Sequence, residues 1–130
     1  MINLKVLWVE DEDNYPDSIN YRLENELNAL SVNITNIEII KTGRDVWIMV
    51  RDWKPDIVMM DHNLEDVTIN GANLITEIRF HNNELPIIFY SSEMGPELIA
   101  MVDGYDEVYT SPRNDTQDEL LRLIKNKFTG

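Results

Sequence analysis

Four consecutive acidic residues, Glu10 to Asp13, follow directly after the apolar run at positions 6–9. At a separation of about 4 Å, two like charges repel by roughly 1 kcal/mol in water and about 4 kcal/mol at an effective dielectric constant near 20. Other apolar runs also end in side chains that carry oxygen: Asp61, Ser91, Ser92, Thr110 and Ser111. Carboxylates that gather in this way are ligands for a hard cation such as Mg²⁺.

We expect Glu10 and Asp11 to bind that cation together with Asp61. In an open parallel α/β sheet, ligands bind outside the carboxyl ends of the strands, and these acids stand at the ends of predicted strands. A divalent ion would turn their repulsion into attraction. Glu12 and Asp13 are expected to stay solvated near the start of a helix, whose dipole favours acids. An acidic pair can equally stand in a solvated loop, but the oxygens that end the other runs favour a site.

Short apolar runs alternate with amphipathic segments along the whole chain. Continuous apolar or β-branched runs predict buried strands, and these cover residues 4–9, 32–40, 55–61, 85–92 and 106–111. Apolar residues at spacings of three and four predict helices, and these cover about 17–30, 43–53, 72–80, 96–102 and 115–128. This alternation predicts a doubly wound parallel α/β sheet with helices on both faces. No repeat or linker interrupts it, so we expect one domain over residues 1–130.

The chain carries 24 acidic residues against 11 lysines and arginines, a formal net charge of −13. Binding to nucleic acids or to anionic membranes requires clustered positive charge, so neither partner is expected. The sequence contains no cysteine, which excludes disulfides and thiolate zinc sites. It shows neither the pattern of a signal peptide nor an apolar run of about 20 residues, so a cytoplasmic location is expected.

Three segments resemble the receiver domain of two-component response regulators: VLWVEDED, KPDIVMMDHNL and ELPIIFYSS. The resemblance covers essentially the whole chain and implies a flavodoxin-like sheet with strand order 2-1-3-4-5. It implies that Asp61 accepts a phosphoryl group and that Glu10, Asp11, Asp61 and the backbone carbonyl of Asn63 bind Mg²⁺. Ser91 would hydrogen-bond a phosphoryl oxygen. The implied partners are a histidine kinase or phosphotransfer protein and a downstream protein, and homodimer formation stays open.

Two features depart from the family pattern. The family carries a lysine before a proline at the end of the fifth strand, and here Ser111 stands before Pro112. A hydroxyl gives a hydrogen bond roughly half as strong as a charge-assisted one. Arg113 would point the same way as Ser111 if the strand continued, whereas Pro112 argues against continuation. The loop after the third strand is longer than usual and adds Glu65 and Asp66.

The leading interpretation is an atypical, Mg²⁺-dependent receiver domain that signals by protein contact. It would not be an enzyme beyond self-phosphorylation and self-dephosphorylation. The alternative is a degenerate receiver that acts as an interaction module without phosphorylation. A phosphatase of the haloacid dehalogenase type is disfavoured, because it would need an aspartate where the chain has Asn63. We expect no output domain after Gly130, so that the signal would pass by protein contact, and the alternative that the chain is one domain of a longer protein stays open.

A few conspicuous side chains have a simpler interpretation than a functional one. Trp8, Trp47 and Trp53 are expected to pack rather than to form a ligand cage. His62, beside the predicted acceptor, is expected to face a partner or to act sterically. Tyr90 fits a core position and a pocket rim equally well.

Overall fold

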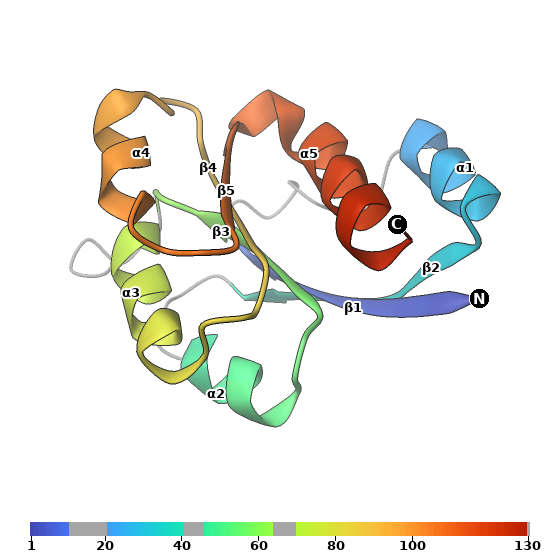
Figure 1. Cartoon of the computed structure of the whole chain (residues 1–130), viewed down its shortest axis with the longest axis horizontal. Helices are drawn as coiled ribbons and strands as arrows, with labels where there is room; N and C mark the ends of the chain where they lie inside the picture. The colour runs from blue at the N-terminus through green and yellow to red at the C-terminus, as the bar shows by residue number, and fades with distance from the viewer. Residues whose placement is uncertain (11–20, 41–45, 64–69, 130) are drawn as a thin grey trace.

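The apolar runs fold into a central parallel sheet with helices on both faces (Figure 1). The computed structural model describes residues 1–10, 21–40, 46–63 and 70–129. The strands are β1 (Ile2–Val9), β2 (Val32–Ile40), β3 (Ile57–Asp61), β4 (Ile87–Ser91) and β5 (Val108–Pro112). All neighbouring pairs are parallel and their order is β2-β1-β3-β4-β5, which confirms the predicted flavodoxin-like fold.

The helices follow the strands in strict alternation. They are α1 (Tyr21–Ala29), α2 (Val46–Asp52), α3 (Gly71–His81), α4 (Pro96–Val102) and α5 (Thr116–Leu123). A 3-10 turn, Arg113–Asp115, leads into α5, and a π-helical segment, Ile124–Phe128, follows it. The predicted helix starts near residues 17 and 43 lie outside the described residues. Within the described part of the chain, no helix has the length and apolar character needed to cross a bilayer.

The sheet separates two hydrophobic cores. Helices α1 and α5 cover one face, and α2, α3 and α4 cover the other (Figure 1). Successive side chains of a strand point to opposite faces, so in β4 Ile87 and Phe89 join the core under α2, α3 and α4. Ile88 and Tyr90 join the core under α1 and α5. Every residue of β3 and β4 is buried, as expected for inner strands covered on both faces.

Helix α3 begins in close contact with the end of β3. Asn70 and Asn73 form a capping box, in which each side chain accepts a hydrogen bond from the other residue's backbone N–H. Gly71 allows the close approach, because a Cβ atom there would lie 2.3 Å from the backbone oxygen of Asp61. The Gly71 N–H also donates to the carbonyl of His62 at 3.0 Å. The start of α3 therefore packs against the Asp61–His62 peptide and is hydrogen-bonded to the carbonyl of His62.

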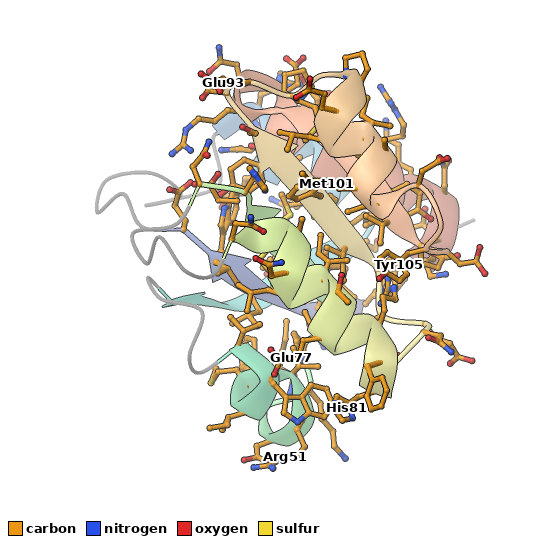
Figure 2. The ribbon with its side chains drawn as sticks, turned by 90° about the vertical axis from the view of Figure 1, so that its left-hand side faces the viewer. Arg51, Glu77, His81, Glu93, Met101 and Tyr105 are labelled. Atoms are coloured by element: carbon orange, nitrogen blue, oxygen red, sulfur yellow. The ribbon has the colours of Figure 1, made fainter. Side chains whose placement is uncertain are left out.

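The two ends of the molecule carry different side chains. Figure 2 looks onto α2, α3 and α4, with Glu93 at the end where the strands finish and with Arg51 and His81 at the opposite end. At that opposite end Trp47 stacks on His81, and the ring centroids are 4.2 Å apart. Trp47 and Trp53 are partly buried against the core under these helices. Both tryptophans pack as predicted and lie away from the strand ends.

Candidate functional site

Asp61 ends β3 and is only 1% exposed. Its Oδ1 accepts a hydrogen bond from the backbone N–H of Asn63 at 3.2 Å. Its Oδ2 accepts one from Nη1 of Arg113 at 3.3 Å. The carboxylate is therefore held in place from the loop that follows β3 and from the segment that follows β5.

Glu10 follows β1 directly and is completely buried. Its Oε1 accepts two hydrogen bonds, one from the hydroxyl of Tyr90 at 2.7 Å and one from Nη2 of Arg113 at 2.8 Å. The Tyr90 hydroxyl in turn accepts a hydrogen bond from the indole Nε1 of Trp8 at 2.8 Å. A buried carboxylate requires such partners, because an unpaired charge in the interior is strongly destabilising.

Arg113 bridges the two carboxylates from the far edge of the sheet. Pro112 ends β5 with an extended backbone (φ −62°, ψ 151°) and pairs with Ser91, so the strand runs on past Ser111. A proline is tolerated there because β5 is an edge strand. The side chain of Arg113, 18% exposed, then reaches both Glu10 and Asp61. The strand itself ends at Pro112 and Arg113 begins the 3-10 turn, so Arg113 reaches the two carboxylates from that turn and not from a continued strand.

Ser111 and Ser91 are both buried at the strand ends, but their hydroxyls differ in their partners. The Ser111 hydroxyl donates to the carbonyl of Pro112 at 2.8 Å. The Ser91 hydroxyl accepts hydrogen bonds from the side-chain amide of Asn63 and from the backbone N–H of Glu93, each at 3.1 Å. Ser91 therefore ties the loop after β3 to the loop after β4, next to Asp61.

The charges of the site are strongly coupled. Burial, and then the charge of Glu10, raises the pKa of Asp61 from its ordinary 3.8 to about 7, although the N–H of Asn63 and the charge of Arg113 act in the opposite direction. Burial works against the charge of Arg113, but the hydrogen bond and the charge of Glu10 outweigh it and raise the pKa of Arg113 above its ordinary value. The site therefore holds a permanent cation between two acids that compete for it.

The donor chemistry of the site fits Mg²⁺. The carboxylates of Glu10 and Asp61 are oxygen ligands of the kind that this ion prefers, and a dication would offset the negative charge of this buried pair. Asp11, the third predicted carboxylate, lies outside the described residues. Among the residues that are described, no three His, Cys, Asp or Glu side chains form a cluster able to hold a metal ion.

A cavity of about 510 Å³ opens between the loops that follow β3 and β4. The residues that line it are His62, Asn63, Ser91, Glu93, Gly95, Pro96, Glu97 and Leu98. The His62 ring is half-buried and meets Phe89 edge-on, with centroids 5.5 Å apart. Burial lowers the pKa of His62 and so disfavours the charged form of the ring.

Tyr90 and Trp8 are parts of the site that the residue types alone do not indicate. The sequence left Tyr90 undecided between core and rim and assigned Trp8 to packing. Both rings are buried in the core under α1 and α5, yet their polar atoms lead to Glu10. The alignment of the strands is the signal that could have identified both residues. Tyr90 lies opposite Asp61 in the neighbouring strand. Trp8 stands two residues before Glu10, so the two side chains point to the same face.

Comparison with known proteins agrees with this fold. The model of the response regulator receiver domain family matches residues 6–106. The chemotaxis protein CheY4 of Vibrio cholerae is similar in structure, with a TM-score of 0.70 and 17% identity over 95% of this chain and 97% of that one. The N-terminal domain of a response regulator/sensory box/GGDEF 3-domain protein from Carboxydothermus hydrogenoformans gives a TM-score of 0.66 at 23% identity, over 94% and 91%. The Francisella response regulator 1452 receiver domain gives 0.65 at 19% identity, over 95% of both chains.

The doubly wound parallel sheet, with Glu10 and Asp61 at its strand ends, defines the class as a flavodoxin-like α/β domain with an acidic site at that edge. Within that class, the chain belongs to the response regulator receiver domain family of two-component signal transduction. Domains of this family partner with histidine kinases, generally bind Mg²⁺ and typically act in signalling rather than as enzymes.

Proposed function

We propose that the chain is an atypical receiver domain that accepts a phosphoryl group on Asp61 from a histidine kinase or a phosphotransfer protein. The observation that carries the proposal is the setting of Asp61: a buried carboxylate at a strand end, with one oxygen hydrogen-bonded to Arg113 and with the next two residues lining a cavity. A nucleophilic carboxylate needs a cation nearby to offset the negative charge of the incoming phosphoryl group.

The transfer forms one bond and breaks one. An oxygen of the ionised Asp61 carboxylate bonds to phosphorus as the P–N bond of the donor phosphohistidine breaks. The electron pair of that bond returns to the donor imidazole nitrogen, and the product on this chain is an acyl phosphate. Asn63 and Arg113 hold the two oxygens of Asp61 before the transfer.

Mg²⁺ is the cofactor that fits the proposed reaction. Glu10, Asp61, the carbonyl of Asn63 and Asp11 are the groups that would hold it. When bound, the ion neutralises phosphoryl oxygens during the transfer. Glu10 also keeps its contact with Arg113, so this chain would place a fixed guanidinium beside the dication.

Arg113 is the proposed replacement for the lysine that the family carries at the end of the fifth strand. Ser111 stands at the lysine position, and its hydroxyl donates to Pro112 rather than to Asp61. The Arg113 guanidinium is permanently charged and contacts both acids. Its planar group with several N–H donors suits a phosphoryl group better than a serine hydroxyl would.

The phosphorylated form would act through protein contact. Phosphorylation adds about one to two negative charges beside the loops that follow β4 and β5. Those loops border the cavity and α4, so they are where we expect a downstream protein to detect the change. We propose a cytoplasmic location, no nucleic-acid or membrane partner for this domain, and an open choice between monomer and homodimer.

One observation favours a second candidate, a degenerate receiver that binds a partner without phosphorylation. The Glu10–Arg113–Asp61 contacts already neutralise part of the acidic cluster from within. Such an internal ion pair could hold a single conformation that needs no phosphoryl group.

Intact-mass spectrometry separates the two candidates. The chain is incubated with acetyl phosphate or phosphoramidate and Mg²⁺, and the gain of one phosphoryl group is measured against time. We expect a gain in the unaltered chain and none in Asp61→Asn, which keeps the shape of the side chain but removes the nucleophile. A gain that persists in Asp61→Asn would place the acceptor elsewhere, and no gain with any donor would favour the degenerate receiver.

A further inference from the structure

A chain of hydrogen bonds leads from the core to the site. The Trp8 indole donates to the Tyr90 hydroxyl at 2.8 Å, and that hydroxyl donates to Oε1 of Glu10 at 2.7 Å. Trp8 is 1% exposed and Tyr90 and Glu10 are completely buried, so solvent does not compete for these bonds. A hydrogen bond to a carboxylate is about twice as strong as one between neutral groups.

Tyr90 also lies against the cation of the site. The guanidinium carbon of Arg113 stands 5.8 Å from the centroid of the Tyr90 ring, within range of a cation–π contact. The backbone carbonyl of Tyr90 accepts a hydrogen bond from the N–H of His62 at 3.0 Å, one residue after Asp61. Tyr90 thus contacts Glu10, Arg113 and the backbone N–H of the residue that follows Asp61.

The direction of the Tyr90–Glu10 bond is fixed. The Trp8 indole can only donate, so the Tyr90 hydroxyl accepts its hydrogen bond. The proton of the Tyr90 hydroxyl is then left to donate to Glu10. Glu10 Oε1 is left with two fixed donors, Tyr90 and Arg113.

We propose that Tyr90 is a positioning residue for phosphoryl transfer at Asp61. Its hydroxyl, held by Trp8, orients Glu10, and Glu10 together with the Tyr90 ring keeps Arg113 beside Asp61. The inference rests on the proposed function, because it assigns Tyr90 a role in that same reaction. Tyr90 touches neither the nucleophilic oxygen nor a donor, so it acts through Glu10 and Arg113.

Tyr90→Phe removes only the hydroxyl and tests this role. The rate of phosphorylation by acetyl phosphate in Mg²⁺ is measured over a range of donor concentrations. We expect the maximal rate to fall about tenfold, as misplacement of a group in the site costs rate, while the donor concentration at half-maximal rate changes little. A merely structural role for the Tyr90 hydroxyl predicts no such selective fall in the maximal rate.

Tyr109→Phe is the matched control. The Tyr109 hydroxyl also donates a hydrogen bond to a glutamate, Glu107 Oε2, at 2.8 Å. That pair stands at the start of β5, away from the carboxyl ends of the strands where Asp61 lies. The same atom is removed and the same kind of bond is lost. We expect Tyr109→Phe to be phosphorylated at the rate of the unaltered chain.

Phosphorylation of the unaltered chain separates the two claims. If the unaltered chain gains no phosphoryl group, the proposed function fails and the positioning role falls with it. If the unaltered chain is phosphorylated and Tyr90→Phe matches it in maximal rate, the proposed function stands and the role of Tyr90 alone is overturned.

A spectroscopic measurement checks the same inference without any phosphoryl donor or any change to Tyr90. Glu10→Gln removes the charge that the Tyr90 hydroxyl faces, so the indole N–H resonance of Trp8 should move in the ¹H–¹⁵N spectrum. The indole resonances of Trp47 and Trp53, which border the other core, should stay in place. A Trp8 resonance that is insensitive to Glu10→Gln would contradict the hydrogen-bond chain.

Discussion

At the scale of single residues, the site is a balance of two buried acids against one arginine. Glu10 and Asp61 are both almost inaccessible to solvent, and Arg113 contacts each of them. Two carboxylates at close range cannot both ionise without cost unless positive charge is near. Burial and the charge of Glu10 raise the pKa of Asp61 despite the opposing charge of Arg113.

The first prediction at this scale concerns pH. The folded state holds the proton of Asp61 up to about pH 7, whereas the unfolded chain releases it near 3.8. The folded state therefore binds more protons between these values, and the contribution of Asp61 to the free energy of unfolding falls as pH rises through that window. In metal-free buffer, the free energy of unfolding of the unaltered chain should fall relative to that of Asp61→Asn as pH rises from 5 to 8. The change in this difference should be on the order of 2 kcal/mol.

Urea denaturation at each pH measures that difference. Asp56→Asn provides the control, since it makes the same substitution at the opposite end of the sheet, where Asp56 accepts a hydrogen bond from the backbone N–H of Lys5. Equal pH dependence in the unaltered chain and in Asp61→Asn would contradict the raised pKa.

The second prediction concerns Arg113. Arg113→Gln leaves two buried acids without their cation, and breaking a buried pair in this way costs about 3–5 kcal/mol. We expect a clear fall in the free energy of unfolding at pH 8 in metal-free buffer. Arg22→Gln, which removes an exposed ion pair with Asp118, should leave stability nearly unchanged. An Arg113→Gln chain as stable as Arg22→Gln would show that the guanidinium does not balance the acids.

At the scale of elements, the site depends on how closely α3 approaches β3. The capping box of Asn70 and Asn73 starts the helix, and Gly71 lies against the peptide that follows Asp61. At the other end of α3, the guanidinium of Arg79 donates to the carbonyls of Asn82, Leu85 and Glu107. Helix α3 is thus fixed at its first turn to the acceptor strand and at its last turn to the starts of β4 and β5.

Gly71→Ala tests the close approach. A Cβ at this position would lie 2.3 Å from the backbone oxygen of Asp61 and 2.8 Å from Cα of His62, so the helix start must move. Overpacking of this kind costs about 1–3 kcal/mol, and we expect the backbone amide resonances of residues 61–63 to shift. Gly104→Ala is the control, because a Cβ there meets nothing within 4 Å. If the two alanine variants were equally stable, α3 would not be braced against the acceptor strand.

At the scale of the whole molecule, a cation that binds only the folded acidic cluster should stabilise the entire domain. At a Mg²⁺ concentration about 100-fold above Kd, the gain is about 2.7 kcal/mol, which raises Tm by several degrees. Thermal melts with Mg²⁺ are compared with melts in KCl of equal ionic strength, since screening alone affects a chain of net charge −13. Equal melting temperatures in the two salts would count against a divalent site.

The sequence was sufficient to predict most of this architecture, for identifiable physical reasons. Short continuous apolar runs such as Ile57 to Met60, in alternation with amphipathic segments, favour inner strands. Parallel strands then bring Glu10, Asp61 and Ser91 to one edge. The path of Arg113 was not predictable, because it depends on the backbone of Pro112 staying extended. The link from Tyr90 to Glu10 joins residues 80 positions apart, and a tyrosine ring suits a core whether or not its hydroxyl finds a partner.

Phosphorus NMR after treatment with phosphoramidate and Mg²⁺ tests the central claim, that Asp61 is the acceptor, most directly. We predict a single protein-bound acyl phosphate resonance in the unaltered chain, which is absent from Asp61→Asn and disappears when the metal is removed before treatment. No protein-bound resonance in the unaltered chain, or one of equal intensity in Asp61→Asn, would contradict the assignment.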